Sequence, residues 1–208
     1  MIFCKGFAAM MPAILNEVRE HGVSVFPGAL RQVYCDAISE EASCAGFTVL
    51  TPQPGAPVVE DMEMLKVPIG HPRFTMLTIV GMELAWIVNP ALKQLGISEW
   101  VPNQAAIHRY HEGSQGLGDH KDYSSDVRII AVVTLSGRGG FDLLYDDHSV
   151  NTHWEFETGD ICLMRAPGLT DAKDDRPLHR ALPPKEGTRQ SVIYREINWK
   201  VAVEKGHL

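Results

Sequence analysis

The sequence lacks an excess of positive charge. Its 208 residues include 19 lysines and arginines against 26 aspartates and glutamates, a formal net charge of −7 at pH 7. A balance of this sign provides no broad electrostatic attraction to nucleic acid or to an anionic membrane, although it leaves room for a local basic groove. We therefore do not expect nucleic acid as a partner.

Cysteine is also scarce. The four cysteines show neither the spacing of a CxxC motif nor the density of a disulfide framework; they are Cys4, Cys35, Cys44 and Cys162. Reduced thiols in a cytoplasmic protein are the simplest interpretation, so a cytoplasmic location is expected.

Long uninterrupted apolar runs are missing as well. The opening MIFCKGFAAMMPAIL is followed by the polar NEVREHG without a small-residue cleavage site, so a secretion signal is not expected. The most apolar stretch, residues 74–95, contains Glu83, Asn89 and Pro90 and is too interrupted for a clean membrane span. It predicts a buried helix and no membrane partner.

The length and a 45% hydrophobic share are those of one globular domain over residues 1–208. Residues 1–100 form the predicted helix-rich support region, with helical patterns over 11–22 and 30–46 that each end at a glycine. A short strand lies between them, in VSVFPGA. Three prolines predict a loop over 51–61, and we expect 51–72 and 165–178 to form a lid and rim.

The second half is rich in short β-branched and aromatic runs separated by glycine-containing turns. The predicted strands are residues 103–111, 127–136, 141–145, 152–157, 160–165 and 189–197. Strands in this arrangement predict a jelly-roll core over about 101–198. The fold class is therefore mainly β with N-terminal helices (α+β).

The segment GLGDHKDYSSD places His120 and Asp122 two residues apart, on one face of an extended chain. One imidazole and one carboxylate leave the coordination of a metal incomplete, so a third ligand must come from elsewhere in the barrel. His179 is favoured because of the sequence that follows it, and His148 and His153 are alternatives.

Arg189 opens the last predicted strand and shares a face with Ser191, Ile193 and Arg195, whereas Glu196 points the other way. A guanidinium on the inner face of a barrel is costly unless an anion meets it. A bound dicarboxylate would satisfy it through a planar two-pronged contact.

Two histidines and one carboxylate with open coordination positions make the facial triad of non-haem Fe(II) oxygenases. Four segments occur in order: IHRYHEGSQGLGDHKD, GRGGFDLL, FETGDICLM and HRALPPKEGTRQSVIYREI. This set resembles the Fe(II)/2-oxoglutarate-dependent dioxygenase superfamily over about residues 103–198. The resemblance implies a double-stranded β-helix, with Fe(II), 2-oxoglutarate and O2 as cofactors and His120, Asp122 and His179 as iron ligands.

The resemblance also implies that Arg189 and Ser191 bind the distal carboxylate of 2-oxoglutarate and that Tyr110 adds a hydrogen bond. Arg195 fits either an inward co-substrate role or a surface ion pair, and His108 either lines the pocket or is a satisfied core histidine. The implied reaction hydroxylates or otherwise oxidises a C–H bond of a small organic substrate and releases succinate and CO2. It requires no catalytic side chain beyond the metal ligands.

Two subfamilies share features with the chain. GLGDHKDYS and HRAL…TRQS resemble the plant-type and isopenicillin-N-synthase-like oxygenases, whereas the spacing of Arg189 and Arg195 resembles that of the AlkB-type nucleic-acid dealkylases. The alternatives are therefore an AlkB-like oxidative demethylase and a non-catalytic, cupin-like metal binder. An arginine placed for a carboxylate favours an enzyme over a simple metal binder. Oligomeric state is not readable from the sequence.

Overall fold

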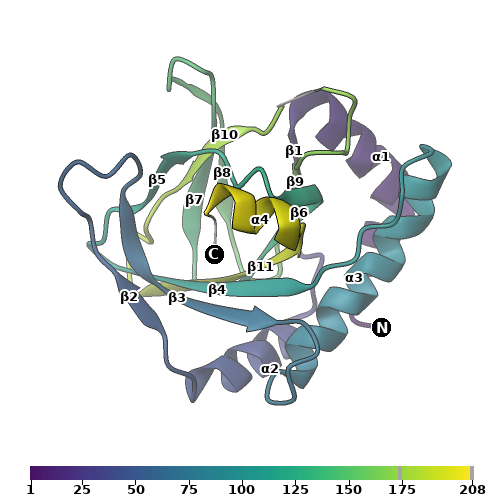
Figure 1. Cartoon of the computed structure of the whole chain (residues 1–208). Coiled ribbons are helices and arrows are strands. Elements are labelled where there is room, and N and C mark those ends of the chain that lie inside the picture. Colours follow the sequence, from purple (N-terminus) through teal and green to yellow (C-terminus); the bar gives the residue numbers. More distant parts are fainter. Residues whose placement is uncertain (173–174, 207–208) are drawn as a thin grey trace.

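The computed structural model describes residues 1–172 and 175–206. Three helices interspersed with strands come first along the chain, then a run of strands and a short last helix (Figure 1). The described helices are α1 (Lys5–His21), α2 (Gln32–Ser43), α3 (Thr75–Gln94) and α4 (Trp199–Lys205). The described strands are β1 (Val23–Phe26), β2 (Thr48–Leu50), β3 (Glu60–Pro68), β4 (Gln104–His111), β5 (Gly116–His120), β6 (Asp126–Ser136), β7 (Gly139–Leu144), β8 (Val150–Phe156), β9 (Ile161–Arg165), β10 (Leu178–Ala181) and β11 (Thr188–Ile197).

The strands form one curled antiparallel sheet in the order β1-β9-β6-β11-β4-β3-β5-β10-β7-β8, with β2 attached to β3. Strand β3 joins its two parts, because residues 63–68 pair with β4 while Glu60 and Asp61 pair with β5. The larger part therefore runs from β1 to β3 and the smaller from β5 to β8. This is the jelly-roll core that the strand pattern predicted.

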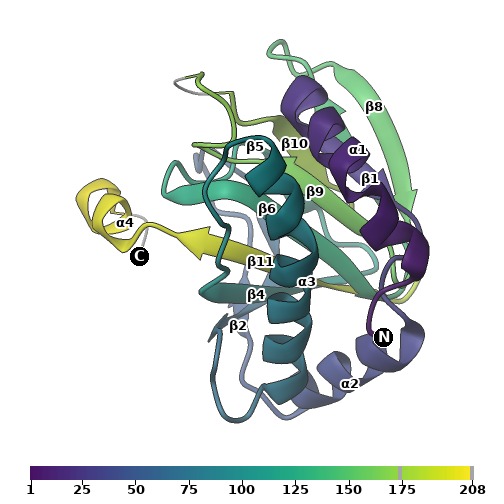
Figure 2. The ribbon, with the colours of Figure 1, turned by 90° about the vertical axis from the view of Figure 1, so that its right-hand side faces the viewer.

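Three helices cover the outer face of the larger part. Figure 2 shows α3 running across the face that contains β4, β6 and β11, with α1 beside β1 and β9. Strand β6 is buried on both faces: Ile129, Ala131 and Val133 pack toward the helices, and Ile130 packs into the barrel. A strand buried on both faces reads as a continuous apolar run, which is why its sequence predicted it well.

Helix α3 confirms the predicted buried helix. By length and composition alone it could cross a membrane, but eight of its residues are buried in this fold. Tyr194 of β11 donates a hydrogen bond of 3.0 Å to the carbonyl of Leu77, and its ring lies against Gly81. The helix therefore docks on the sheet where a glycine leaves room for an aromatic ring.

The predicted C-terminal end is confirmed for the first helix and wrong for the second. Helix α1 ends before Gly22, which has φ of 87°, the left-handed conformation that glycine adopts most readily. Helix α2 ends at Ser43, three residues before the predicted Gly46.

The segment 51–72 is not the predicted lid throughout, because β3 occupies Glu60–Pro68. The strand escaped prediction because Val67 is its only β-branched residue and charged side chains interrupt it. Strands β2, β5 and β10 and helix α4 were likewise not predicted as elements. The proposed rim 165–178 follows β9 and includes residues 173–174, which lie outside the described residues.

Candidate metal and co-substrate site

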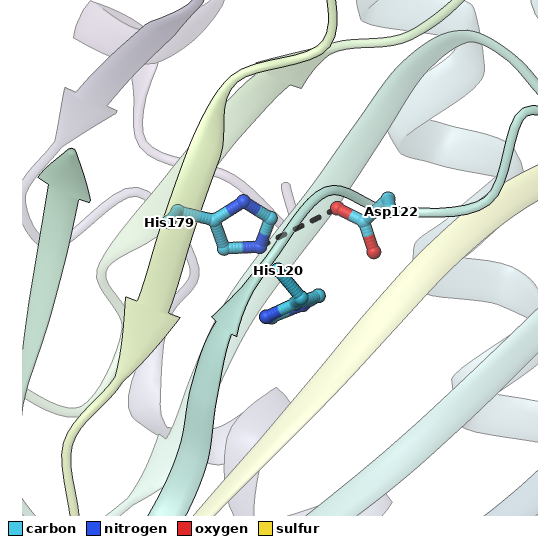
Figure 3. A group of neighbouring side chains, drawn as sticks. All are labelled: His120, Asp122 and His179. Carbon is cyan, nitrogen blue, oxygen red and sulfur yellow. Dashed lines mark ion pairs between the residues drawn. The ribbon is translucent and has the colours of Figure 1, made fainter. Parts of the chain in front are cut away.

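Three side chains, on β5, on β10 and just beyond the end of β5, form a group suited to a metal ion. Ligand atoms of His120, Asp122 and His179 all lie within 4.8 Å of one another. His120 and His179 are paired across the two strands, and Asp122 follows two residues after β5 ends (Figure 3). Two imidazoles and a carboxylate on one side of a cavity are the donor set of a facial triad, so the residues present fit Fe(II).

A β-bulge in β5 determines which of its side chains face the cavity. His179 pairs with His120, but Ala181, two residues on, pairs with Leu117, three residues back. The extra residue in β5 lets Leu117 and His120 both line the cavity, which strict alternation forbids. Asp119 consequently faces away from the cavity, toward Arg180 and His148.

Backbone carbonyls orient both histidines. Nδ1 of His120 donates to Gly118 O at 2.8 Å, and Nδ1 of His179 donates to Pro177 O at 3.1 Å. Each ring therefore presents Nε2 as the free nitrogen. Burial, reinforced by His120, lowers the pKa of His179 to about 4, which keeps this ring in the neutral, metal-binding form at pH 7.

The carboxylate of Asp122 is held by a buried arginine. Arg195 Nη2 lies 3.3 Å from Asp122 Oδ1, and Arg176 donates to the backbone carbonyl of Asp122. Burial alone raises the pKa of the Asp122 carboxyl, but His179 and Arg195 outweigh it and hold that pKa below its ordinary value. The carboxylate is thus ionised and fixed before any ligand arrives.

Arg189 is buried without a carboxylate partner among the residues described. It is 1% exposed, its Nη1 donates to Gly140 O at 3.3 Å, and its Nε has no hydrogen-bond partner. The guanidinium lies near the rings of Tyr110 and Phe156, at 5.8 and 5.5 Å from their centroids. Burial lowers the pKa of Arg189, yet an arginine keeps its charge in proteins, so a positive charge lies in this cavity without a carboxylate partner in the described chain.

The GRGG turn makes room for this arginine. A Cβ on Gly139 would lie 2.8 Å from Cδ of Arg189, and one on Gly137 would lie 2.9 Å from its Cα. Both distances are shorter than real Cβ contacts. Gly139 therefore forms the wall against which the Arg189 side chain packs, and Gly137 lets the turn approach the backbone of β11.

Polar side chains between Arg189 and the metal ligands complete the cavity. Ser191 and His108 are cross-strand partners on β11 and β4, and His108 Nδ1 lies 3.2 Å from the Tyr110 hydroxyl. Burial raises the pKa of Tyr110 to about 12 and lowers that of His108 to about 3, aided by Arg195. At pH 7 the cavity therefore holds a neutral phenol and a neutral imidazole beside the unpaired cation of Arg189.

Comparison with solved structures identifies this architecture. A prolyl-4-hydroxylase from Pseudomonas putida superposes with a TM-score of 0.63 at 17% identity, over 91% of this chain and 100% of that one. An oxidoreductase of the 2OG-Fe(II) oxygenase family from Burkholderia pseudomallei gives 0.61 at 14% identity, over 94% and 92% of the two chains. The chain has the fold of the Fe(II)/2-oxoglutarate oxygenases.

Other comparisons agree with this assignment of the fold. A prolyl hydroxylase from Trichoplax adhaerens, solved with a hypoxia-inducible-factor peptide fragment, gives a TM-score of 0.64 at 11% identity, over 96% of this chain and 94% of that one. No protein-family model and no curated protein matches the sequence. The fold that the resemblance implied is therefore confirmed, at 11% to 17% sequence identity to these structures.

The structure brings all the predicted site residues of this oxygenase fold to one cavity. Its lining includes the three expected metal ligands and all five expected co-substrate residues, which are His108, Tyr110, Arg189, Ser191 and Arg195. Arg195 points inward, so the surface ion pair considered for it is wrong. His148 and His153 instead contact Asp119 and Asp142 on the other side of the strands, so neither is the third ligand. Direct contacts to 2-oxoglutarate stay a prediction for all five residues.

A second cleft opens beside the metal ligands and was not predicted. It shares His108, His120, Asp122 and Arg195 with the first cavity. Its floor comes from alternate residues of β3 and β4, namely Glu60, Met62, Met64, Lys66, Gln104 and Ala106. The period-two pattern in EDMEMLK was the signal that could have revealed it.

Proposed function

We propose that this protein is an Fe(II)- and 2-oxoglutarate-dependent dioxygenase that hydroxylates a C–H bond of its substrate. The observation that carries the proposal is Arg189, a buried guanidinium without a carboxylate partner in the described chain, in the same cavity as the His120, Asp122 and His179 group. A protein that only binds a metal has no use for such a cation, because burying it costs free energy.

Each residue has a defined part in this proposal. His120, Asp122 and His179 would hold the iron, and Arg189 with Ser191 would bind the far carboxylate of 2-oxoglutarate. Bound Fe(II), with 2-oxoglutarate and O2, supplies the oxidising chemistry, and the co-substrate leaves as succinate and CO2. Tyr110 stays protonated because burial raises its pKa to about 12, so its hydroxyl can donate a hydrogen bond to a carboxylate.

The substrate that is to be oxidised would bind in the second cleft, since the metal ligands His120 and Asp122 also line this cleft. Met62 and Met64 provide an adaptable apolar floor, and Glu60 and Lys66 add one charge of each sign. A small organic molecule or a short peptide fits these features. The Trichoplax prolyl hydroxylase is similar in fold and was solved with a peptide bound.

Succinate formation tests the reaction. Purified protein supplied with Fe(II), ascorbate, 2-oxoglutarate and O2 should release succinate slowly by uncoupled turnover and faster when a substrate from a small-molecule or peptide panel is present. His179→Ala should abolish this release, whereas Arg138→Ala, an exposed arginine in the GRGG turn, should leave it unchanged. Metal binding without any succinate would favour the non-catalytic binder.

A further inference from the structure

The outer face of the smaller part of the sheet carries a row of charged side chains that the proposed reaction does not use. The outer ion-pair row consists of His148, Asp119, Arg180, Asp142 and His153. Its contacts run in sequence: His148 Nδ1 to Asp119 Oδ2 at 2.8 Å, Asp119 Oδ1 to Arg180 Nη1 at 3.5 Å, Arg180 Nη2 to Asp142 Oδ2 at 2.8 Å, and Asp142 Oδ1 to His153 Nδ1 at 2.6 Å. The row therefore links β5, β10, β7 and β8.

Asp142 is the centre of this row. It is 2% exposed, and both of its oxygens accept hydrogen bonds, Oδ2 from Arg180 and Oδ1 from His153. Arg180 and Asp142 are direct cross-strand partners on β10 and β7, and Asp142 and His153 are partners on β7 and β8. A buried carboxylate so enclosed fixes the positions of the strands on either side of it.

Each member of the row on β5, β10 and β7 is the chain neighbour of a residue in the metal cavity. Asp119 precedes His120, and Arg180 follows His179. Asp142 follows Phe141, whose ring stacks on His179 with centroids 5.3 Å apart and planes 26° apart. Because side chains alternate across a strand, a contact on the outer face sets where the adjacent side chain points on the inner face.

We propose that the outer ion-pair row, on the face of the sheet opposite the cavity, fixes the positions of the two metal-binding histidines. Through its contacts with Asp142 and Asp119, Arg180 fixes the separation of β5, β10 and β7. Asp119 lies within the bulged segment between Leu117 and His120, directly before His120, so its position sets that of the histidine. Arg180 and Asp142 are positioning residues, since they touch neither the metal group nor the cavity. The inference rests on the metal site of the proposed function and concerns how tightly that site holds its ion.

Metal affinity and stability must be measured separately to test this role. Co(II) is the probe, because its visible absorption reports ligand geometry, and the melting temperature of the metal-free protein reports stability. Arg180→Lys keeps the charge but loses the guanidinium geometry, so Co(II) should bind more weakly with an altered spectrum. The loss should be up to about 10-fold, the lower end of the effect of removing a group bonded directly to a ligand, because Arg180 acts through the strands. The control Arg138→Lys changes an exposed arginine paired with Glu157 at 3.0 Å and should leave both readouts unchanged.

Arg180→Gln removes the arginine from the buried Asp142 and leaves His153 as its ion-pair partner, so the variant could fail to fold. The double variant Arg180→Gln with Asp142→Asn removes both charges and should recover most of the melting temperature while the weakened Co(II) binding persists. Recovery of affinity together with stability, or unchanged affinity in Arg180→Lys, would overturn the positioning role. Failure of the unsubstituted protein to bind Co(II) would instead contradict the proposed function.

Discussion

At the residue scale, Arg189 is a buried charge whose burial costs free energy of folding. Its guanidinium is enclosed by Tyr110, Phe156 and Gly139, and within the described part of the chain it donates one hydrogen bond, to the carbonyl of Gly140 at 3.3 Å. A buried cation with so little compensation destabilises the ligand-free protein, and in the proposed function the 2-oxoglutarate carboxylate would be its partner. The sequence predicted this from an inward-facing position and the direction of Glu196, and both features hold in the structure.

Replacing Arg189 by methionine separates its effect on stability from its effect on 2-oxoglutarate binding. We expect Arg189→Met to leave the melting temperature of the ligand-free protein unchanged or raised, because an unpaired buried charge is removed. The 2-oxoglutarate concentration for half-maximal succinate release should rise about 10- to 100-fold, since a charge-assisted hydrogen bond contributes about 1.5–3 kcal/mol. A fall of several degrees in melting temperature with unchanged 2-oxoglutarate dependence would show that Arg189 is structural.

Gly139→Ala tests the packing of the same side chain without touching its charge. The new Cβ would lie 2.8 Å from Arg189 Cδ, so the guanidinium must move and 2-oxoglutarate should bind more weakly. Gly46→Ala is the matched control, because a Cβ there meets nothing within 4 Å and the backbone is not strained. Equal 2-oxoglutarate affinity in both variants, measured by titration, would contradict the close packing.

At the element scale, the pair of strands β7 and β8 carries a pH-dependent contact. The hydrogen bond that His153 Nδ1 donates to the Asp142 carboxylate raises the pKa of His153 above its ordinary value, and Glu155, 3.5 Å from the other ring nitrogen, adds to this. A raised folded-state pKa means that protonated His153 stabilises the fold at acidic pH and that this contribution is lost as pH rises through that pKa.

We therefore expect the melting temperature of metal-free wild type to exceed that of His153→Gln most at pH 5.5 and least at pH 8.5. Half-exposure of the ring limits the size of the effect. Thermal unfolding of both proteins at the two pH values checks it, and a difference that grows toward pH 8.5 would have the wrong sign.

Elements differed in how well their sequences predicted them. Strand β6 is apolar on both faces and β11 alternates between the helices and the cavity, so pattern alone located both. Strand β3 borders a cleft on one face and places Glu63 against Arg109 at 2.8 Å, so its charges obscured the pattern. The bulge in β5 was not predictable, because it depends on the partner register with β10.

At the scale of the whole molecule, the helical layer supports the sheet that carries Arg189, Ser191 and Arg195. Val192 and Tyr194 of β11 belong to the core shared with α1, α2 and α3, while the intervening residues line the cavity. Every second residue of one strand thus packs against the helices, and the others build the site. The ordered motifs were enough to predict this division, but not the cleft formed by β3.

Gly81→Leu should loosen the helical layer without altering the chemistry of the site. A Cβ at Gly81 would lie 2.8 Å from the Tyr194 ring, so a larger side chain must displace α3 or β11. We expect a loss of about 1–3 kcal/mol in the free energy of unfolding, from overpacking. Denaturant titration measures it, and a stability equal to that of wild type would show that α3 does not dock through this contact.

Occupation of one cavity by both Fe(II) and 2-oxoglutarate is the central claim, and an anaerobic titration tests it most directly. Fe(II) and 2-oxoglutarate are added to the metal-free protein, and the visible charge-transfer band of the chelate is recorded for wild type, His179→Ala and Arg189→Ala. The account predicts a band in wild type, none in His179→Ala, and one that requires far more 2-oxoglutarate in Arg189→Ala. Bound Fe(II) with no band at any 2-oxoglutarate concentration would contradict it.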